Sequence, residues 1–235
     1  MKRITLTLRV LAHLLSYPGP DLRQHLGELR LALHDERALS AGRLAELDAL
    51  IDRLGGALGF QIEEAYVETF DRGRGTALHL FEHVHGDSRD RGPAMVDLVK
   101  TYEQAGLFMA PDELPDHLTV VLEYASTQPP AQAREFLREI AHILQTIFSA
   151  LLKRQSPYAS VLAAVLELAG ERAQAVKLPD EPALDESWEE PLAFDGCSTQ
   201  GQARPGQPQP IQIVKRPPMG SNQGATAQAH PGARA

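Results

Sequence analysis

The chain has 235 residues, of which 43% are hydrophobic and 23% charged, and its formal net charge is −8. Its single cysteine excludes a disulfide scaffold, and the acidic balance argues against non-specific binding to nucleic acid. Because no nearly unbroken apolar run reaches about 20 residues, we expect no direct insertion into a membrane. Aromatic residues make up only 6%, and the apolar residues are mostly Leu and Ala, which favours helices over strands.

The first apolar stretch, residues 3–16, has the basic start of an export signal but not its other features. Arg9 and His13 interrupt the apolar run, and no small-residue cleavage motif follows before Tyr17 and Pro18. The apolar positions instead fit one face of a helix: Ile4, Leu8, Leu11 and Leu15. We therefore predict a core helix, no export signal and a cytoplasmic location.

Further helical segments follow along the chain, separated by Pro and Gly residues. Ser40 and Pro93 are typical of helix starts. Apolar spacing and end signals place the segments near residues 21–35, 40–56, 60–71, 76–84, 93–106, 114–126, 131–154 and 157–170. No segment of useful length alternates with the period of a strand. We predict an all-α fold, a single helical bundle domain of about eight helices.

The composition changes after Leu178. Residues 179–235 contain 9 of the 17 prolines and 6 of the 18 glycines, together with many Gln and Ala residues. So few apolar residues cannot offset the entropy of the chain. We predict an all-helical domain over residues 1–178 and a disordered, Pro/Gly/Gln-rich tail over residues 179–235. Two short apolar islands in this tail are candidates for docking, Trp188–Asp195 and Pro210–Val214.

Acidic residues concentrate in the middle of the chain. Residues 61–130 hold 13 acidic and 5 basic side chains. An acidic surface prefers a basic partner and speeds the encounter with it. The alternative is an ordinary solvated helix face that is kept soluble by its charge.

The string His79-Leu80-Phe81-Glu82-His83 matches the spacing of one class of zinc peptidase. The two histidines share a helix face, and Glu82 would be the general base. Against this, the predicted helix is short, and no third ligand identifies itself. Cys197 has no fixed His beside it, and no nucleophile or phosphate-binding motif occurs. We predict that the protein is not an enzyme. The alternatives are a zinc-dependent hydrolase using His79, Glu82 and His83, and incidental metal binding.

Three stretches of the chain are similar to one known family. They are Tyr66–Arg72, Leu78–Leu98 and Glu113–Leu118. Further matches are Tyr102, Ala105–Leu107 and Leu122–Tyr124, and the tail matches at Trp188–Pro191, Phe194–Cys197 and Gln209–Val214. Through these stretches the chain resembles the NarJ-type assembly chaperones of respiratory nitrate reductase, the delta-subunit family of the TorD-like group. The resemblance also argues against the hydrolase, because members of this family are not peptidases.

The resemblance implies an all-helical chaperone that binds the N-terminal segment of the folding catalytic subunit of nitrate reductase. The chaperone would hold this client ready for insertion of the molybdenum cofactor and an iron–sulfur cluster, and would delay docking on the membrane partner. The molybdenum cofactor is then handled in the client, and the chaperone binds none stably. Proteins that deliver the cofactor are further candidate partners. The alternatives are a sibling chaperone for another molybdoenzyme and a permanent subunit of the reductase.

Candidate residues for binding the client peptide follow from their positions in the matched stretches. A groove between helices would bury the apolar face of a client helix, while nearby acidic residues meet its basic ones. The candidates are Tyr66, Glu68, Phe70, Asp71, His79, His83, Asp87, Arg89, Arg91, Asp116, His117 and Glu123.

Overall fold

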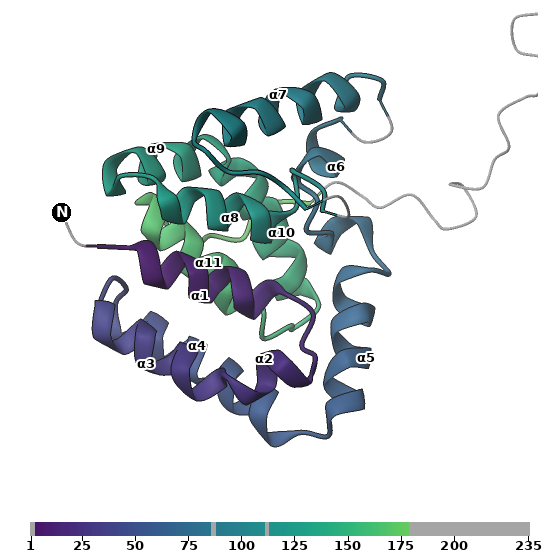
Figure 1. Cartoon of the computed structure of the whole chain (residues 1–235). Coiled ribbons are helices and arrows are strands. Elements are labelled where there is room, and N and C mark those ends of the chain that lie inside the picture. Colours follow the sequence, from purple (N-terminus) through teal and green to yellow (C-terminus); the bar gives the residue numbers. More distant parts are fainter. Residues whose placement is uncertain (1–2, 86–87, 111–112, 179–235) are drawn as a thin grey trace, which may run out of the picture. The chain divides into compact units, whose positions relative to one another are not determined.

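The computed structural model describes residues 3–85, 88–110 and 113–178 (Figure 1). These residues form eleven α-helices and one short 3-10 helix and contain no β-strand, so the predicted all-α fold is confirmed. The predicted tail, with its two apolar islands, lies outside the described residues. The elements are α1 (Thr5–Leu15), α2 (Pro20–Gln24), α3 (Leu26–Glu36), α4 (Ala41–Gly56), α5 (Gly59–Phe70), η1 (Arg74–Thr76), α6 (Leu80–His85), α7 (Arg91–Gln104), α8 (Leu118–Thr127), α9 (Pro130–Glu139), α10 (Ala141–Lys153) and α11 (Ala159–Ala169).

About eight helices are expected, and nine segments are placed along the sequence; because two of these segments are each divided in the structure, the described part contains eleven helices. The segment 21–35 breaks at His25, between α2 and α3, where the backbone has φ −99° and ψ 4°. The segment 131–154 breaks at Ile140, between α9 and α10, with φ −92° and ψ 3°. The apolar pattern continues across both breaks, so spacing alone does not reveal them.

Helix α11 is the centre of the hydrophobic core. Nine of its eleven residues are buried, all except Ser160 and Glu167. A helix that is apolar all round needs neighbours on every side, and α11 packs against α1, α4, α9 and α10. Helix α1 also lies alongside α8 (Figure 1). This pair of helices carries one side of the candidate site.

Helices α5 and α7 lie at the edge of the bundle in Figure 1 and bury only part of their surface. Helix α5 buries Ile62, Tyr66 and Phe70 on one face, and α7 fully buries only Tyr102. Their remaining faces are therefore open to partners. Within the described ranges, no helix combines the length and the apolar character that crossing a bilayer requires.

Candidate partner-binding site

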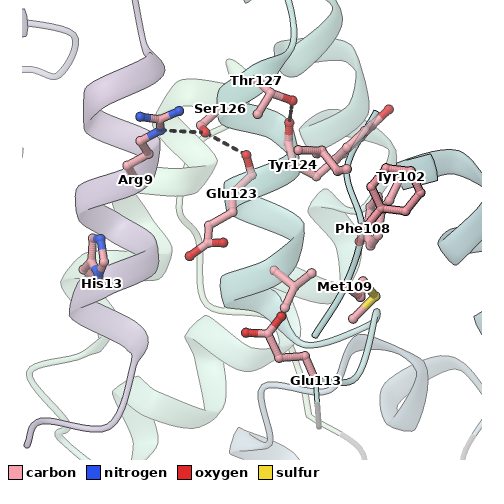
Figure 2. A pocket seen from close by; sticks show the side chains of 12 residues that line it. Arg9, His13, Tyr102, Phe108, Met109, Glu113, Glu123, Tyr124, Ser126 and Thr127 are labelled. Atoms are coloured by element: carbon pink, nitrogen blue, oxygen red, sulfur yellow. Dashed lines mark hydrogen bonds between the residues drawn. The ribbon is translucent and has the colours of Figure 1, made fainter. Parts of the chain in front are cut away.

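An open cavity of about 360 Å³ lies between α1, α8 and the segment that follows α7 (Figure 2). Helix α8 supplies five of its lining residues, and α1 supplies two. The cavity combines apolar, aromatic and charged side chains, which suits a protein segment with one apolar and one polar face. The lining residues are Arg9, His13, Tyr102, Leu107, Phe108, Met109, Glu113, Val120, Glu123, Tyr124, Ser126 and Thr127.

Hydrogen bonds fix the wall that α1 and α8 form. The Arg9 Nε donates to Ser126 Oγ at 3.3 Å, and Ser126 Oγ donates to the Glu123 carbonyl oxygen at 2.7 Å. Ser126 is buried, whereas Arg9, His13 and Glu123 are exposed. Arg9 and His13 are four residues apart in α1, so they lie one turn apart on the same face. This face is exposed, whereas the opposite face of α1 packs in the core. This wall therefore presents charged side chains on a well-anchored backbone.

The opposite wall is a short non-helical segment with exposed apolar side chains. Gly106 follows α7 in the left-handed conformation, with φ 78°, and the Leu107 N–H donates to the Tyr102 carbonyl oxygen at 3.0 Å. Beyond this turn the Phe108 side chain is 83% exposed and lies beside Met109 (Figure 2). Since an aromatic ring gains free energy when it leaves water, Phe108 is well placed to bury against a partner.

Two carboxylates border the same cavity. Glu123 belongs to α8, and Glu113 belongs to the segment that precedes α8. Figure 2 shows both carboxyl groups in the space between α8 and α1. Neither side chain has a hydrogen-bond or ion-pair partner among the residues that the structure describes, so both are free to meet a cation on a bound segment.

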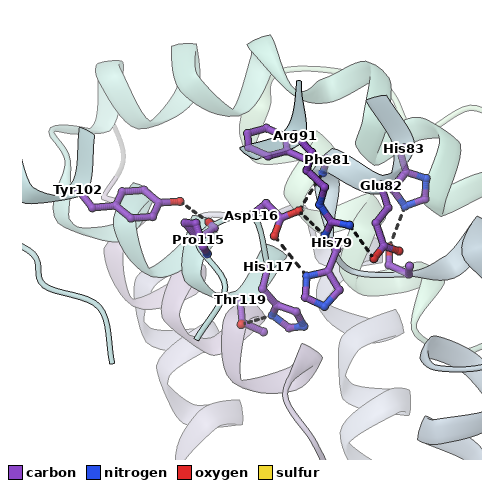
Figure 3. A network of polar contacts seen from close by, with 11 residues as sticks. His79, Phe81, Glu82, His83, Arg91, Tyr102, Pro115, Asp116, His117 and Thr119 are labelled. Carbon is purple, nitrogen blue, oxygen red and sulfur yellow. Dashed lines mark hydrogen bonds and ion pairs between the residues drawn. The ribbon is translucent and has the colours of Figure 1, made fainter. Parts of the chain in front are cut away.

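A buried carboxylate holds together three segments near this cavity (Figure 3). Asp116 is completely buried. Its Oδ1 accepts from His79 Nδ1 at 3.3 Å, and its Oδ2 accepts from the Phe81 N–H at 3.2 Å. The guanidinium of Arg91, at the start of α7, lies 3.5 Å from the same Oδ2. Asp116 therefore ties the beginnings of α6 and α7 to the segment that leads into α8.

Tyr102 connects this network with the cavity. Its Oη donates to the Pro115 carbonyl oxygen at 2.8 Å, directly before Asp116. Its ring packs against Tyr124 with 4.9 Å between the ring centres, and both tyrosines line the cavity. Burial raises the pKa of Tyr102, so the hydroxyl remains a protonated donor around neutral pH.

The network shifts proton affinities in opposite directions. The hydrogen bond to Asp116 raises the pKa of His79, although burial acts against it. Burial acts to raise the pKa of Asp116, but the bonds from His79 and the Phe81 N–H, with the charges of His79 and Arg91, bring it below its usual value. Burial, helped by the charge of His79, lowers the pKa of His117 to about 4. These shifts favour protonation of His79 beside an ionised Asp116 and favour a neutral His117.

The predicted residues Tyr66 and Phe70 lie in the core and are not exposed in a groove. Their rings are 4.8 Å apart, and both contact the ring of Tyr158 at the start of α11. The Tyr66 Oη donates to the Leu15 carbonyl oxygen at 2.7 Å. Apolar positions that repeat along a helix face the interior unless another feature marks them as exposed, and in α5 these two positions anchor the helix.

The other predicted residues fall into separate places. Four meet in the buried network: His79, Arg91, Asp116 and His117. Three are exposed on the surface: Glu68, Asp71 and Arg89. Of the predicted set, only Glu123 borders the cavity, and Asp87 lies outside the described residues.

The zinc-like string has another role in this structure. His79 bonds to Asp116, Glu82 pairs with Arg91 at 3.4 Å, and His83 Nε2 donates to the Ala77 carbonyl oxygen at 2.8 Å. The three side chains therefore turn to three different partners. Among the described residues, no group of three or more His, Cys, Asp or Glu side chains is arranged to hold a metal ion.

Sequence reasoning missed most of the cavity. In the sequence, Arg9 and His13 stand out only as interruptions of an apolar run, and the segment 107–109 lies between two predicted helices. One signal for it exists in the sequence. Three consecutive apolar residues, Leu107-Phe108-Met109, follow a turn glycine at a point where a polar connector is usual.

Comparison with known proteins identifies the family. The sequence matches the nitrate reductase delta subunit family over residues 22–164. The chain belongs to this family. It is 40% identical over 204 residues to the Escherichia coli K12 protein NarJ, a nitrate reductase molybdenum cofactor assembly chaperone, covering 81% of this chain and 86% of that protein. The hydrolase alternative is therefore wrong, because these relatives are assembly chaperones and not catalysts.

Two further comparisons extend the family and the fold. A probable nitrate reductase molybdenum cofactor assembly chaperone of Bacillus subtilis is 31% identical over 173 residues, covering 71% of this chain and 91% of that protein. A crystal structure from Archaeoglobus fulgidus, of a protein assigned to redox enzyme maturation, superposes with a TM-score of 0.51 at 18% identity. It covers 73% of this chain and 96% of the archaeal chain. At that identity the likeness shows the fold alone.

Proposed function

We propose that this protein is a chaperone for the assembly of a respiratory nitrate reductase and that its client is the catalytic subunit. It binds the N-terminal segment of that subunit in the cytoplasm, before the subunit docks on its membrane partner. While bound, the client stays ready for insertion of the molybdenum cofactor and an iron–sulfur cluster. Family membership and the similarity to nitrate reductase assembly chaperones support the assembly role.

The protein is not an enzyme, as its family indicates. The titratable groups of Figure 3 are bonded to one another and to the backbone, which makes them structural. We propose that the molybdenum cofactor is handled in the client, which supplies the binding site. The chaperone then controls when the client is open to the cofactor.

The observation that carries the proposed site is the exposed Phe108 beside a cavity with two carboxylates that have no side-chain partner among the described residues. An amphipathic helix can place an apolar side chain into this cavity, where Phe108, Met109 and Val120 surround it. Basic side chains on the same helix can then meet Glu113 and Glu123. Apolar burial supplies most of the affinity in this arrangement, and the charges supply orientation and speed of encounter.

Binding at this site explains a delay in assembly by mass action. A segment that occupies the cavity is not available to the membrane partner, so docking waits until the segment is released. The chaperone needs no energy input for this, because it only has to bind the undocked client more tightly than the docked client.

A peptide with the N-terminal sequence of the cognate catalytic subunit tests the proposal by isothermal titration calorimetry. The wild-type protein should bind it, and Phe108→Ala should weaken binding by about 1–3 kcal/mol because the ring loses its contact with the peptide. Leu31→Ala is the matched control: Leu31 on α3 is also exposed and does not line the cavity, so its affinity should stay that of the wild type.

Charge reversal separates the electrostatic contribution. Glu123→Lys should slow association and reduce its dependence on salt, with a smaller effect on dissociation. An equally tight N-terminal peptide from a different molybdoenzyme would favour a sibling chaperone. Unchanged affinity in Phe108→Ala, with native circular dichroism, would place the client site elsewhere.

A further inference from the structure

The outer face of α5 exposes apolar side chains next to one another. The Phe60 side chain is 64% exposed, and Val67 lies two turns further along the helix. Tyr17, from the segment after α1, is exposed beside them, and the three border a hollow of about 300 Å³. Contiguous apolar surface with a polar rim marks interaction sites. The residues of this α5 face are Tyr17, Phe60, Glu63, Glu64, Val67, Glu68 and Arg72.

The helical geometry of α5 keeps this face exposed. Ile62, Tyr66 and Phe70 repeat at four-residue spacing and fill the core side. Phe60 lies two positions before Ile62 and therefore on another side of the helix. A rotation of α5 that turned Phe60 into the core would turn Tyr66 out of it. Because Tyr66 is anchored by its bond to the Leu15 carbonyl oxygen, a rotation of α5 is disfavoured.

The charges around the hollow are predominantly negative. Glu63 accepts from Tyr17 Oη at 3.2 Å and lies 3.8 Å from Arg23, and Glu68 pairs with Arg72 at 2.7 Å. Glu64 is exposed and has no hydrogen-bond or ion-pair partner in the described part of the chain. The Glu68–Arg72 pair is exposed, and such pairs are weak and exchange readily for a better-placed partner. The α5 face therefore offers carboxylates to an incoming cation.

The α5 face and the cavity of Figure 2 have no lining residue in common. The cavity uses Arg9 and His13 on α1, whereas the α5 face uses Tyr17, which follows the end of α1. A partner on α5 thus does not need Phe108, the residue on which the proposed client site depends. Binding at α5 is therefore independent of the proposed client site.

We propose that the α5 face is a second docking surface, for a basic amphipathic helix of a protein partner. Apolar side chains of the partner cover Phe60 and Val67, and its Lys or Arg residues pair with Glu64 and Glu68. A guanidinium or ammonium group can also lie over the ring of Phe60 or Tyr17, which adds a cation–π contact. The same carboxylates repel nucleic acid and anionic lipid, so the charge pattern selects a basic protein segment.

A pair of model peptides tests this surface with the full-length protein carrying Phe108→Ser. This background removes the cavity aromatic, because the proposed client site also takes a basic amphipathic helix. The first is a labelled amphipathic helix of Leu and Lys, and the second has the same Leu positions with Glu in place of Lys. In fluorescence anisotropy at low salt, the Lys peptide should bind and the Glu peptide should bind at least about tenfold more weakly. Phe60→Ser should weaken the Lys peptide about tenfold or more, and Glu64→Lys should slow its association.

Matched variants decide where the peptide binds. Leu31→Ser changes an α3 side chain that is also 64% exposed and should leave binding unchanged. The proposal is overturned if Phe60→Ser binds as its Phe108→Ser parent does, if the Glu peptide binds equally well, or if the Phe108→Ser parent does not bind the Lys peptide. The client-peptide titration is scored separately, so failure of either site is recognised by itself.

Discussion

Asp116 can be buried as a carboxylate because several neighbouring groups compensate for its lost hydration. A carboxylate that is removed from water loses several kcal/mol of hydration free energy. A single ion pair does not offset that loss. Asp116 instead contacts the His79 imidazole, a backbone N–H and a guanidinium, and the raised pKa of His79 favours the charged form of that imidazole. The same compensation restricts the geometry, since His79 and Arg91 must stay where the carboxylate is. The residue therefore acts as a positioning group for the segment beside the cavity.

The lowered pKa of His117 predicts that the stability of the protein depends on pH. Its pKa is about 4 in the folded protein and 6.5 when unperturbed, so below pH 6.5 the unfolded chain binds a proton that the folded protein refuses. Stability is therefore lost as the pH falls from 6.5 towards 4. His79 acts oppositely: its raised pKa contributes stability that is present at low pH and lost as the pH rises through the folded value.

The variant His117→Asn should isolate the first effect. Asn cannot take up a proton but can keep a hydrogen bond to Thr119 Oγ1, which lies 2.6 Å from His117 Nδ1. Between pH 7 and pH 5, the wild type should lose on the order of 1 kcal/mol more unfolding free energy than the variant. Urea unfolding at the two pH values measures the difference. Equal losses in both proteins would mean that His117 titrates normally.

At the scale of elements, the turn at Gly106 shapes the apolar wall of the cavity. Its φ of 78° is left-handed, and a Cβ built there meets no atom within 4 Å. The only cost of Gly106→Ala is therefore backbone strain, and the free energy of unfolding should fall by about 1 kcal/mol. Gly42→Ala is the control, because a Cβ at this helical position also meets nothing within 4 Å. Chemical unfolding should show it equal to the wild type or slightly more stable; two equally destabilised variants would contradict the argument.

Elements with a strong apolar period were predictable, and their interruptions were not. The Ser40 start of α4 is confirmed by the hydrogen bond from the Arg43 N–H to Ser40 Oγ, at 3.4 Å. The breaks at His25 and Ile140 depend on how neighbouring helices must turn to reach the core, which local propensity does not contain. Phe70 shows the same limit: its apolar character is evident from the sequence, but its burial against Tyr158 from a distant helix is not.

At the scale of the molecule, the cavity brings together parts of the chain that are far apart in sequence. Arg9 and Ser126, 117 positions apart, share a hydrogen bond across α1 and α8. No spacing rule connects such residues, so only family resemblance could point to a binding function before the fold was known. Resemblance located the Asp116 motif, which supports the site, and Glu123, which borders it.

The sequence predicts that the folded domain ends at Leu178. Residues 179–235 are poor in core-forming side chains, so a chain ending at Leu178 should unfold within a few degrees of the full chain and bind the client peptide equally well. A chain ending at Glu171 is the control. It loses the bond from Gln145 to the Arg172 carbonyl oxygen and the bond from the Val176 N–H to Ser149 Oγ. At about 1 kcal/mol each, these bonds should lower its unfolding midpoint by several degrees. Calorimetry measures both unfolding midpoints. A large decrease in the midpoint of the chain that ends at Leu178 would show that the domain extends beyond this residue.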